Sequence, residues 1–295
     1  MARLLSVHAH PDDEASKGAP TVHKAVAEGH RAVLVCATGG EEGDIINKAM
    51  DRPEVRADLH AVRMAELEAS VAAIGFHETY MLGYRDSGMP DSEANANPGC
   101  FAMADLDEAT GRLVKIVRDE RPHVMMTYSD DQQGYLHPDH LRVHDISVLA
   151  YERAADPDWY PELGEPWQVS KLYYSTWSRA RIVAYHEAYD RLSIDSPYDE
   201  KWFERPSQDH RITTKIDITA HFSARRAALL AHATQIDPEE KFWFGLSDDH
   251  AVEAYPWDDY ILARSEVGPI PVPDEGEDFE GDLFAGIEAA VGGDR

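Results

Sequence analysis

The chain has 295 residues, of which 43% are hydrophobic and six are tryptophan, enough apolar material for a sizeable folded core. Its formal net charge of −27 argues against nucleic acid or an anionic membrane as a partner, because both require a basic face. Neither of the two cysteines belongs to a CxxC pair, so we expect no disulfide framework and no thiolate zinc site. The chain enters its first strand without a leader pattern and has no long apolar run, which favours a cytoplasmic location.

The first half of the chain alternates short apolar runs with helical patterns. The apolar runs predict strands at 4–7, 32–37, 79–82 and 123–128. The helical spacing predicts helices at 21–28, 56–74, 105–120 and 141–154. This alternation predicts an α/β fold, Rossmann-like and doubly wound, with a mostly parallel sheet over residues 1–155 that forms the catalytic core.

The second half is harder to assign. Residues 156–267 are expected to form a smaller C-terminal α/β portion that completes the substrate pocket, with strands at 171–175 and 213–218 and helices near 181–189 and 220–233. Whether this portion continues the sheet or forms a separate lobe stays open. Residues 268–295 contain eight acidic residues and one arginine, which predicts an acidic, weakly ordered tail.

A cluster of polar residues follows the first predicted strand, in the stretch HAHPDDE at 8–14. Ligands bind at the carboxyl ends of strands in open α/β sheets, and His, Asp and Glu are metal ligands and general bases. We therefore predict a metal hydrolase site around His10, Asp12 and Asp13. Because Asp12 and Asp13 are adjacent, their side chains cannot point the same way, which leaves one for the metal and one for the substrate. His8 is expected to pack inside the fold.

A second cluster, YLHPDH at 135–140, follows the fourth predicted strand. In parallel topology the loops after the first and fourth strands share one edge of the sheet. We therefore expect one ion bound by His10, Asp13 and one of three later histidines, namely His137, His140 or His144. The sequence also allows a metal site made by His140 and His144 alone. This interpretation is less favoured, because no Glu follows His140 as in HExxH sites.

Two further features have ordinary explanations. Glu41 and Glu42 are expected to be solvated, with a contact to the rim of the site as the alternative. Arg63 and Glu66 have the spacing of an ion pair on a helix. The Gly39-Gly40 loop lacks the GxGxxG spacing of a dinucleotide site, so a bound nicotinamide cofactor is not expected.

The two motifs together resemble the LmbE-like family of zinc amide hydrolases, which have a Rossmann-like fold. The resemblance extends to GGEEGD at 39–44, RMAEL at 63–67 and GYRDSGM at 83–89. Within the family, SKG at 16–18, YPWDDY at 255–260 and the acidic tail are more similar to mycothiol S-conjugate amidases than to GlcNAc-inositol deacetylases.

This resemblance implies one zinc ion per chain, with Fe²⁺ as an alternative in the cell, bound by His10, Asp13 and His140. It implies that Asp12 is the general base toward the attacking water. His137 is then the group that stabilises the oxyanion or donates a proton, assisted by Tyr135. The positions implied to contact the substrate are Lys17, Arg63 and Asp86, to which we add Glu42 at the rim.

The resemblance also implies a small-molecule substrate. An amidase of this kind cleaves the amide between N-acetylcysteine and glucosaminyl-inositol in mycothiol S-conjugates and releases a mercapturic acid, a step in thiol detoxification. The alternative enzyme is a deacetylase of N-acetylglucosaminyl-inositol or another N-acetyl sugar. A non-enzyme alternative is a sugar-binding protein with a structural zinc, but such a site closes with four ligands and leaves no free carboxylate. The sequence leaves the oligomeric state open.

Overall fold

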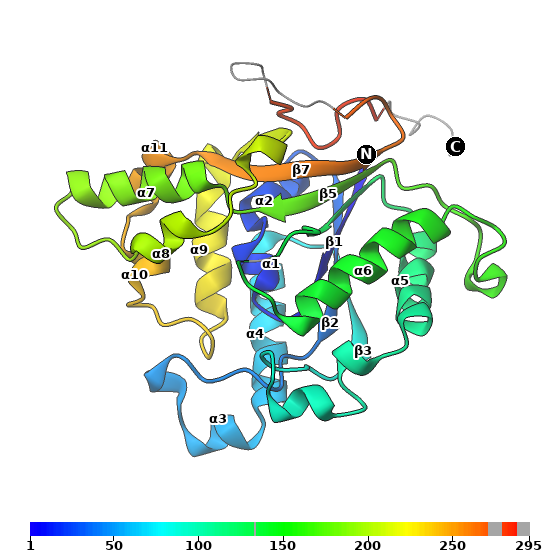
Figure 1. Ribbon diagram of the computed structural model, residues 1–295, viewed down its shortest axis with the longest axis horizontal. Helices are drawn as coiled ribbons and strands as arrows, with labels where there is room; N and C mark the ends of the chain where they lie inside the picture. The colour runs from blue at the N-terminus through cyan, green and yellow to red at the C-terminus, as the bar shows by residue number, and fades with distance from the viewer. Residues whose placement is uncertain (133, 271–278, 288–295) are drawn as a thin grey trace.

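The computed structural model describes residues 1–132, 134–270 and 279–287. Seven strands form one sheet in the order β3-β2-β1-β4-β5-β7-β6, with helices on both faces (Figure 1). The strands are β1 (Arg3–His8), β2 (Arg31–Thr38), β3 (Glu78–Tyr84), β4 (Val124–Tyr128), β5 (Lys171–Thr176), β6 (Thr214–Asp217) and β7 (Trp257–Ser265). The helices are α1 (Asp13–Ser16), α2 (Ala19–Ala27), α3 (Pro53–Ala57), α4 (Leu59–Ile74), α5 (Leu106–Glu120), α6 (Pro138–Arg153), α7 (Arg179–Arg191), α8 (Glu200–Glu204), α9 (Phe222–Ala231), α10 (Lys241–Phe244) and α11 (Asp248–Ala254).

The central strands bury both of their faces. Successive side chains of a strand point to opposite faces, so Leu4 and Leu34 pack under α2, α4 and α9, whereas Leu5 and Val33 pack under α5 and α6. All four side chains are essentially inaccessible to water. This two-sided burial explains the continuous apolar runs of the sequence and confirms the predicted Rossmann-like, doubly wound fold.

The sheet has a topological switch point between β1 and β4. The chain passes from β1 to β2 and β3 on one side, then returns to add β4 on the other side of β1, parallel to it. The loops after β1 and β4 therefore leave the sheet edge in opposite directions and open a crevice there. Ligands bind at such crevices in open α/β folds.

The second half of the chain continues the same sheet. Strand β5 pairs with β4 in parallel, and β7 lies antiparallel between β5 and β6. Strand β7 is not indicated by the sequence pattern because its second and third residues are acids that are buried here, Asp258 and Asp259. Asp258 accepts hydrogen bonds from Thr21, at 2.9 Å, and from Arg225, so its charge is compensated inside the fold.

The predicted helix over 56–74 is divided in two. Asp58 has an extended φ of −148° and its side chain accepts a hydrogen bond from the backbone N–H of Ala61 at 3.1 Å. A helix cap of this kind is more favourable for Asp than a place inside a helix. The chain therefore ends α3 at Ala57 and restarts as α4 at Leu59.

Residues 279–287, which belong to the acidic tail expected over 268–295, lie against the body of the protein. Glu280 bridges to Thr214 of the edge strand β6, its carboxylate accepts a hydrogen bond from Tyr173 at 2.5 Å, and it forms an ion pair with Lys171. Leu283 is buried. Glu280 and Leu283 thus attach this segment to the sheet. The other parts of the predicted tail, 271–278 and 288–295, lie outside the described residues.

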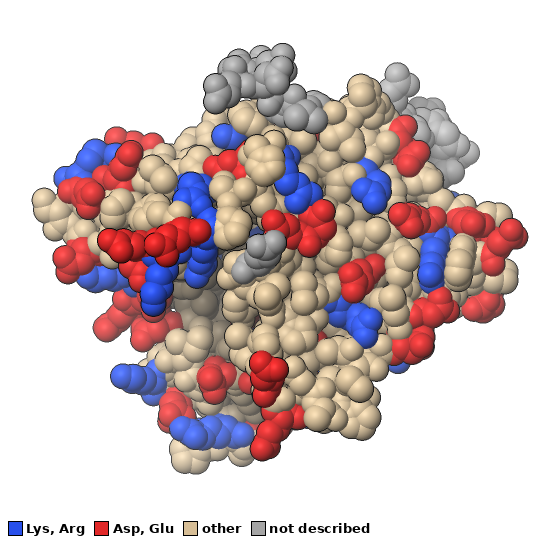
Figure 2. Space-filling model, viewed as in Figure 1, with Lys and Arg blue, Asp and Glu red and all other residues tan. Residues whose placement is uncertain are grey.

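Acidic side chains are spread over the face shown in Figure 2, with basic side chains among them. This distribution agrees with the net charge of −27. Within the described residues, no helix has both the length and the apolar character needed to cross a membrane.

We predict that Asp259 makes the stability of the fold fall as the pH rises. Burial raises the pKa of Asp259 from 3.8 to about 6, more than Ser178, Tyr255, Arg181 and Lys215 lower it. The folded state then holds a proton that the unfolded state releases between these two pH values. The free energy of unfolding should drop by up to about 3 kcal/mol from pH 4 to pH 7 through this group.

Asp259→Asn removes this titration and provides the matched comparison. Urea unfolding of both proteins from pH 4 to pH 7.5 should show the wild type losing stability relative to the variant through pH 6. Parallel pH curves for the two proteins would contradict the assignment.

Candidate metal centre and active site

The loop after β1 places two adjacent aspartates in different directions. Asp12 has a φ of 114°, a conformation that side-chain-bearing residues rarely adopt. Asp13 begins α1, and its Oδ2 accepts a hydrogen bond from the backbone N–H of His10 at 3.0 Å. The unusual turn at Asp12 directs the Asp13 carboxylate to the crevice and leaves the Asp12 carboxylate toward Arg63, as expected for the pair.

His10 lies among three carboxylates in the crevice. Its Nδ1 is 3.3 Å from Asp13 Oδ2, and its Nε2 is 3.1 Å from Asp139 Oδ2 and 3.5 Å from Asp86 Oδ1. Burial by itself lowers the pKa of His10, but the three carboxylates outweigh burial and raise the pKa well above its usual value. All four side chains are buried. Buried carboxylates at this density require a cation, which a metal ion supplies as well as a protonated imidazole does.

His140 shares one Asp13 oxygen with His10. Its Nε2 is 3.3 Å from Asp13 Oδ2, the same atom that faces His10 Nδ1. Burial lowers the pKa of His140 to about 3, so its imidazole is neutral and free to act as a ligand. The structure therefore brings together all three residues predicted to bind the metal. Within the part of the chain that the structure describes, the sets whose donor atoms all lie within 4.8 Å of one another are His10, His137 and His140, and His10, Asp86 and Asp139; Asp13 belongs to neither set.

His144 is not part of this cluster. Its Nδ1 lies 3.0 Å from the backbone oxygen of Tyr128, and its ring contacts Tyr174 edge-on. Of the three later histidines that the sequence left open, His137 and His140 reach the crevice and His144 does not. His8 is packed inside the fold, as expected, with its Nε2 2.8 Å from Ser6 Oγ.

Arg63 holds Asp12 in place. The buried guanidinium donates to Asp12 Oδ2 at 3.0 Å and to the backbone oxygens of Pro11 and Gly40. Burial raises the pKa of Asp12, and the positive charge of Arg63 opposes this. The expected ion pair between Arg63 and Glu66 is wrong. Glu66 instead accepts hydrogen bonds from Thr234, at 2.8 Å from the backbone N–H and 2.7 Å from Oγ1.

Glu14 fixes the backbone of Asp12 from behind. Its Oε2 accepts a hydrogen bond from the Asp12 N–H at 2.9 Å, and its Oε1 lies 2.6 Å from His232 Nε2 and also accepts from Ser70. Glu14 and His232 are both buried. An unfavourable backbone conformation persists only where its surroundings fix it from several sides. Glu14, Ser70 and His232 meet this requirement for Asp12.

His137 lies inside the cluster and Tyr135 at its rim. The His137 ring is centred 4.5 Å from the His10 ring, and its Nδ1 accepts a hydrogen bond from the Asp139 N–H at 3.2 Å. Burial, followed by the charge of His10, lowers the pKa of His137. Tyr135 is about half exposed, with its hydroxyl 3.5 Å from Met89 Sδ.

Of the four residues predicted to contact the substrate, three lie beside the cluster around His10 and one does not. Lys17 Nζ donates to Asp13 Oδ1 at 2.5 Å, and Asp86 faces His10. The side chain of Glu42 turns away and pairs with Arg85, while only its backbone N–H approaches Asp86, at 3.3 Å. Lys17, Arg63 and Asp86 therefore adjoin the cluster, and the Glu42 side chain does not.

Several residues of the site were not predicted. Tyr128 donates from its hydroxyl to Asp13 Oδ2 at 2.6 Å and accepts from the Ala9 N–H at 2.8 Å. Asp139 accepts from the Ser87 N–H at 2.9 Å and faces His10. Repetition of His-Pro-Asp in the two motifs was a signal for Asp139, whereas Tyr128 looks like an ordinary core residue at the end of a strand.

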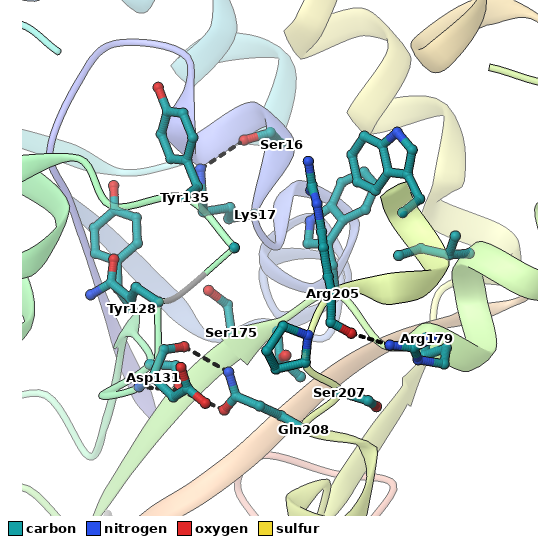
Figure 3. A pocket seen from close by; sticks show the side chains of 18 of the residues that line it. Ser16, Lys17, Tyr128, Asp131, Tyr135, Ser175, Arg179, Arg205, Ser207 and Gln208 are labelled. Atoms are coloured by element: carbon teal, nitrogen blue, oxygen red, sulfur yellow. Dashed lines mark hydrogen bonds between the residues drawn. The ribbon is translucent and has the colours of Figure 1, made fainter. Parts of the chain in front are cut away.

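A cleft of about 530 Å³ opens beside the cluster and extends toward the second half of the chain. His140, Lys17 and Tyr128 line one end. Figure 3 shows Ser16, Lys17 and Tyr135 at this end and Arg179 and Ser207 across the cleft, with Gln208 hydrogen-bonded to Asp131. The far wall is aromatic and is formed by Trp177, Trp202, Phe242 and Trp243.

Comparison with known proteins gives consistent matches. Residues 5–151 match the family PIG-L, described as GlcNAc-PI de-N-acetylase. A mycothiol S-conjugate amidase of Streptomyces coelicolor is 40% identical over 294 residues, covering 97% of each chain. A 1D-myo-inositol 2-acetamido-2-deoxy-alpha-D-glucopyranoside deacetylase of Streptomyces avermitilis is also 40% identical, over 299 residues and 97% of each chain.

A solved structure supports the same fold. The N,N'-diacetylchitobiose deacetylase of Pyrococcus horikoshii has a TM-score of 0.61 and 18% identity, covering 88% of this chain and 83% of that one. The two HPD motifs lie at the switch point, and the similarity to the relatives spans nearly the whole chain. The chain therefore belongs to the PIG-L family of LmbE-like deacetylases and amidases.

Proposed function

We propose that this chain is a mycothiol S-conjugate amidase, which cleaves the amide between N-acetylcysteine and glucosaminyl-inositol and releases a mercapturic acid. Its relatives hydrolyse amide bonds, so the chain is an amide hydrolase rather than a sugar-binding protein with a structural metal. The choice of substrate rests on the 530 Å³ cleft beside His140 and Lys17. The acyl group of an S-conjugate carries a bulky thioether, whereas an acetyl group needs space only for a methyl.

A deacetylase of N-acetylglucosaminyl-inositol is the second candidate. The amidase and the deacetylase compared above are each 40% identical to this chain, so identity does not separate the two reactions. The open cleft favours the amidase because it would stay largely empty around an acetyl group.

The proposed metal is Zn²⁺, one per chain, bound by His10, Asp13 and His140, with Fe²⁺ as the alternative in the cell. The family is metal-dependent, and imidazole and carboxylate donors suit either ion. Three protein ligands leave a position open for chemistry, and the buried negative charge around His10 suits a divalent cation. When bound, the ion supplies Lewis acidity, which makes water a better nucleophile and polarises the amide carbonyl.

Asp12 is the proposed general base. Burial raises its pKa, which makes the carboxylate a stronger base, while Arg63 keeps it ionised and oriented. Asp12 accepts the proton of the attacking water and passes it to the leaving amine nitrogen. The turn at φ 114° separates this carboxylate from that of Asp13, so one residue moves the proton and the other binds the metal.

His137 is the proposed donor to the carbonyl oxygen. Burial lowers the pKa of His137, so its imidazole is neutral at pH 7 and carries a single N–H. Because Nδ1 accepts from the Asp139 N–H, the ring proton is on Nε2, where it can be donated to developing negative charge. The Tyr135 hydroxyl, at the rim, assists the same oxygen.

We predict that Asp12→Asn lowers turnover by about 10²–10⁴-fold while the protein keeps its metal. Asn removes the base but keeps the size of the side chain, and it tolerates the positive φ at this position better than Ala does. The measurement is the kcat for an S-conjugate together with the metal content of the purified variant. Near-normal turnover with metal bound would show that another residue is the base.

We predict that His140→Ala loses most of its metal, whereas His144→Ala retains it. His140 faces the shared Asp13 oxygen, and His144 is bonded to the Tyr128 backbone one turn further along α6. Metal analysis of both variants after gel filtration tests the ligand assignment, with thermal unfolding as the check on folding. Equal metal content in the two variants would remove His140 from the ligand set.

We predict that kcat/KM is roughly tenfold or more higher for a mycothiol S-conjugate than for N-acetylglucosaminyl-inositol, because filling the cleft is worth binding energy that an acetyl group cannot supply. Both substrates are assayed with the same metal-loaded preparation by the amine they release. A preference for the acetylated sugar would assign the chain as the deacetylase.

A further inference from the structure

Four aromatic side chains form a continuous surface on the far wall of the cleft. Trp177 and Trp202 each lie nearly parallel to Phe242, with ring centroids 5.5 and 5.3 Å away. Trp243 meets the edges of this stack, at 4.7 Å from Phe242. Because these rings line an open cleft, they provide an apolar surface against which another ring can pack, edge-to-face or offset.

These aromatic side chains are only partly buried. The aromatic residues of the sheet, such as Tyr173 and Tyr260, are essentially inaccessible to water. Leaving several large apolar rings partly in water is unfavourable, and clustered exposure of this kind marks a binding surface. The cluster adjoins His140 and Lys17 in one cleft, so a molecule held at the metal centre can extend onto it.

Arg205 adds a positive charge to the same wall. Its guanidinium lies 3.9 Å from the centre of the Trp202 ring, and Figure 3 shows the side chain pointing toward Ser16 and Lys17. The residues that line the cleft include Lys17, Arg179 and Arg205 but one acid, Asp131. Lys17 is paired with Asp13, and the Arg179 guanidinium donates to the backbone oxygens of Phe203 and Arg205. Arg205 is therefore the cation of this wall that favours an electron-rich or anionic group.

A second arginine–tryptophan pair differs from Arg205 and Trp202 in the hydrogen-bond partners of its arginine. Arg153 also lies 3.9 Å over a ring, that of Trp159, but it donates to Asp107 at 2.6 Å and to Tyr160 at 2.8 Å. Within the described residues, the Arg205 guanidinium lies over the Trp202 ring and has no carboxylate partner. Arg153 is therefore a satisfied surface residue, whereas Arg205 retains its donors for a ligand.

We propose that this wall binds a flat, conjugated ring carried on the sulfur of the S-conjugate, and binds it more tightly when the ring carries an acidic group. The inference rests on the proposed function and specifies the class of thiol adduct. The amide lies at the metal centre, the ring packs against Trp202 beside the Arg205 guanidinium, and the acidic group meets that guanidinium.

Product binding tests this separately from catalysis. The probes are two mercapturic acids that differ only in the ring, S-benzyl-N-acetylcysteine and S-cyclohexylmethyl-N-acetylcysteine, titrated into the metal-loaded protein by calorimetry. They bury similar apolar area, but only the benzyl ring can stack. We expect the benzyl compound to bind about two- to tenfold more tightly.

The variant for the wall is Trp202→Leu, and the matched control is Trp159→Leu, which removes an exposed tryptophan outside the cleft. The preference for the benzyl ring should vanish in the first variant and persist in the second. Equal affinities for the two probes in the wild type, or an unchanged preference in Trp202→Leu, would overturn the proposal.

The charge is tested with S-(4-carboxybenzyl)-N-acetylcysteine. It should bind more tightly than the benzyl compound to the wild type and to Arg153→Gln, and lose this advantage in Arg205→Gln. An advantage that survives in Arg205→Gln would remove Arg205 from the site.

The outcomes also separate this inference from the proposed function. A protein that binds the ring through Trp202 but hydrolyses only the acetylated sugar supports the ring site and refutes the amidase. Hydrolysis of S-conjugates together with equal binding of benzyl and cyclohexylmethyl probes supports the amidase and refutes the ring site.

Discussion

The concentration of carboxylates around His10 is the constraint on which the site depends. Asp13, Asp86 and Asp139 come from the segments that follow three different strands, yet all lie within 3.5 Å of one imidazole and are buried. Uncompensated charges of this kind would destabilise the fold by several kcal/mol each. A cation at this point links the loops after β1, β3 and β4. The buried negative charge that favours a metal ion in the crevice therefore also holds these loops together at this edge of the sheet.

The proposed division of roles between Asp12 and Asp13 depends on the second half of the chain. Glu14 holds the Asp12 backbone, and Glu14 in turn contacts His232, which follows α9. The residues after β5 thus do more than extend the sheet. They support the strained turn of the catalytic loop from behind and form the aromatic wall of the cleft in front. The support of the Asp12 turn and the aromatic wall of the cleft both require the C-terminal portion to pack firmly against the core.

The sequence predicted the parts of this arrangement that are local. HAHPDDE at 8–14 and YLHPDH at 135–140 each follow an apolar run, and parallel topology then requires the two motifs to meet at one edge. Buried runs and capped helices can be recognised without tertiary information, which is why the core fold was predicted well. The break at Asp58 was missed because a helix cap within a helical pattern depends on one residue.

The remaining features depend on distant contacts. Tyr128 and His232 look like core or surface residues in sequence, and only the folded chain brings them to Asp13 and Glu14. Strand β7 was hidden by its buried acids. The partners of Asp258 lie on α2 and α9, and Asp259 accepts hydrogen bonds from Ser178 and Tyr255. The direction of the Glu42 side chain depends in the same way on Arg85.

The most direct test of the account is a diffraction measurement at the absorption edge of zinc on metal-loaded crystals. The account predicts one ion per chain bound by His10, Asp13 and His140, with an open position on the side of Asp12. An ion bound instead by His10, Asp86 and Asp139, or one closed by four protein ligands, would contradict it.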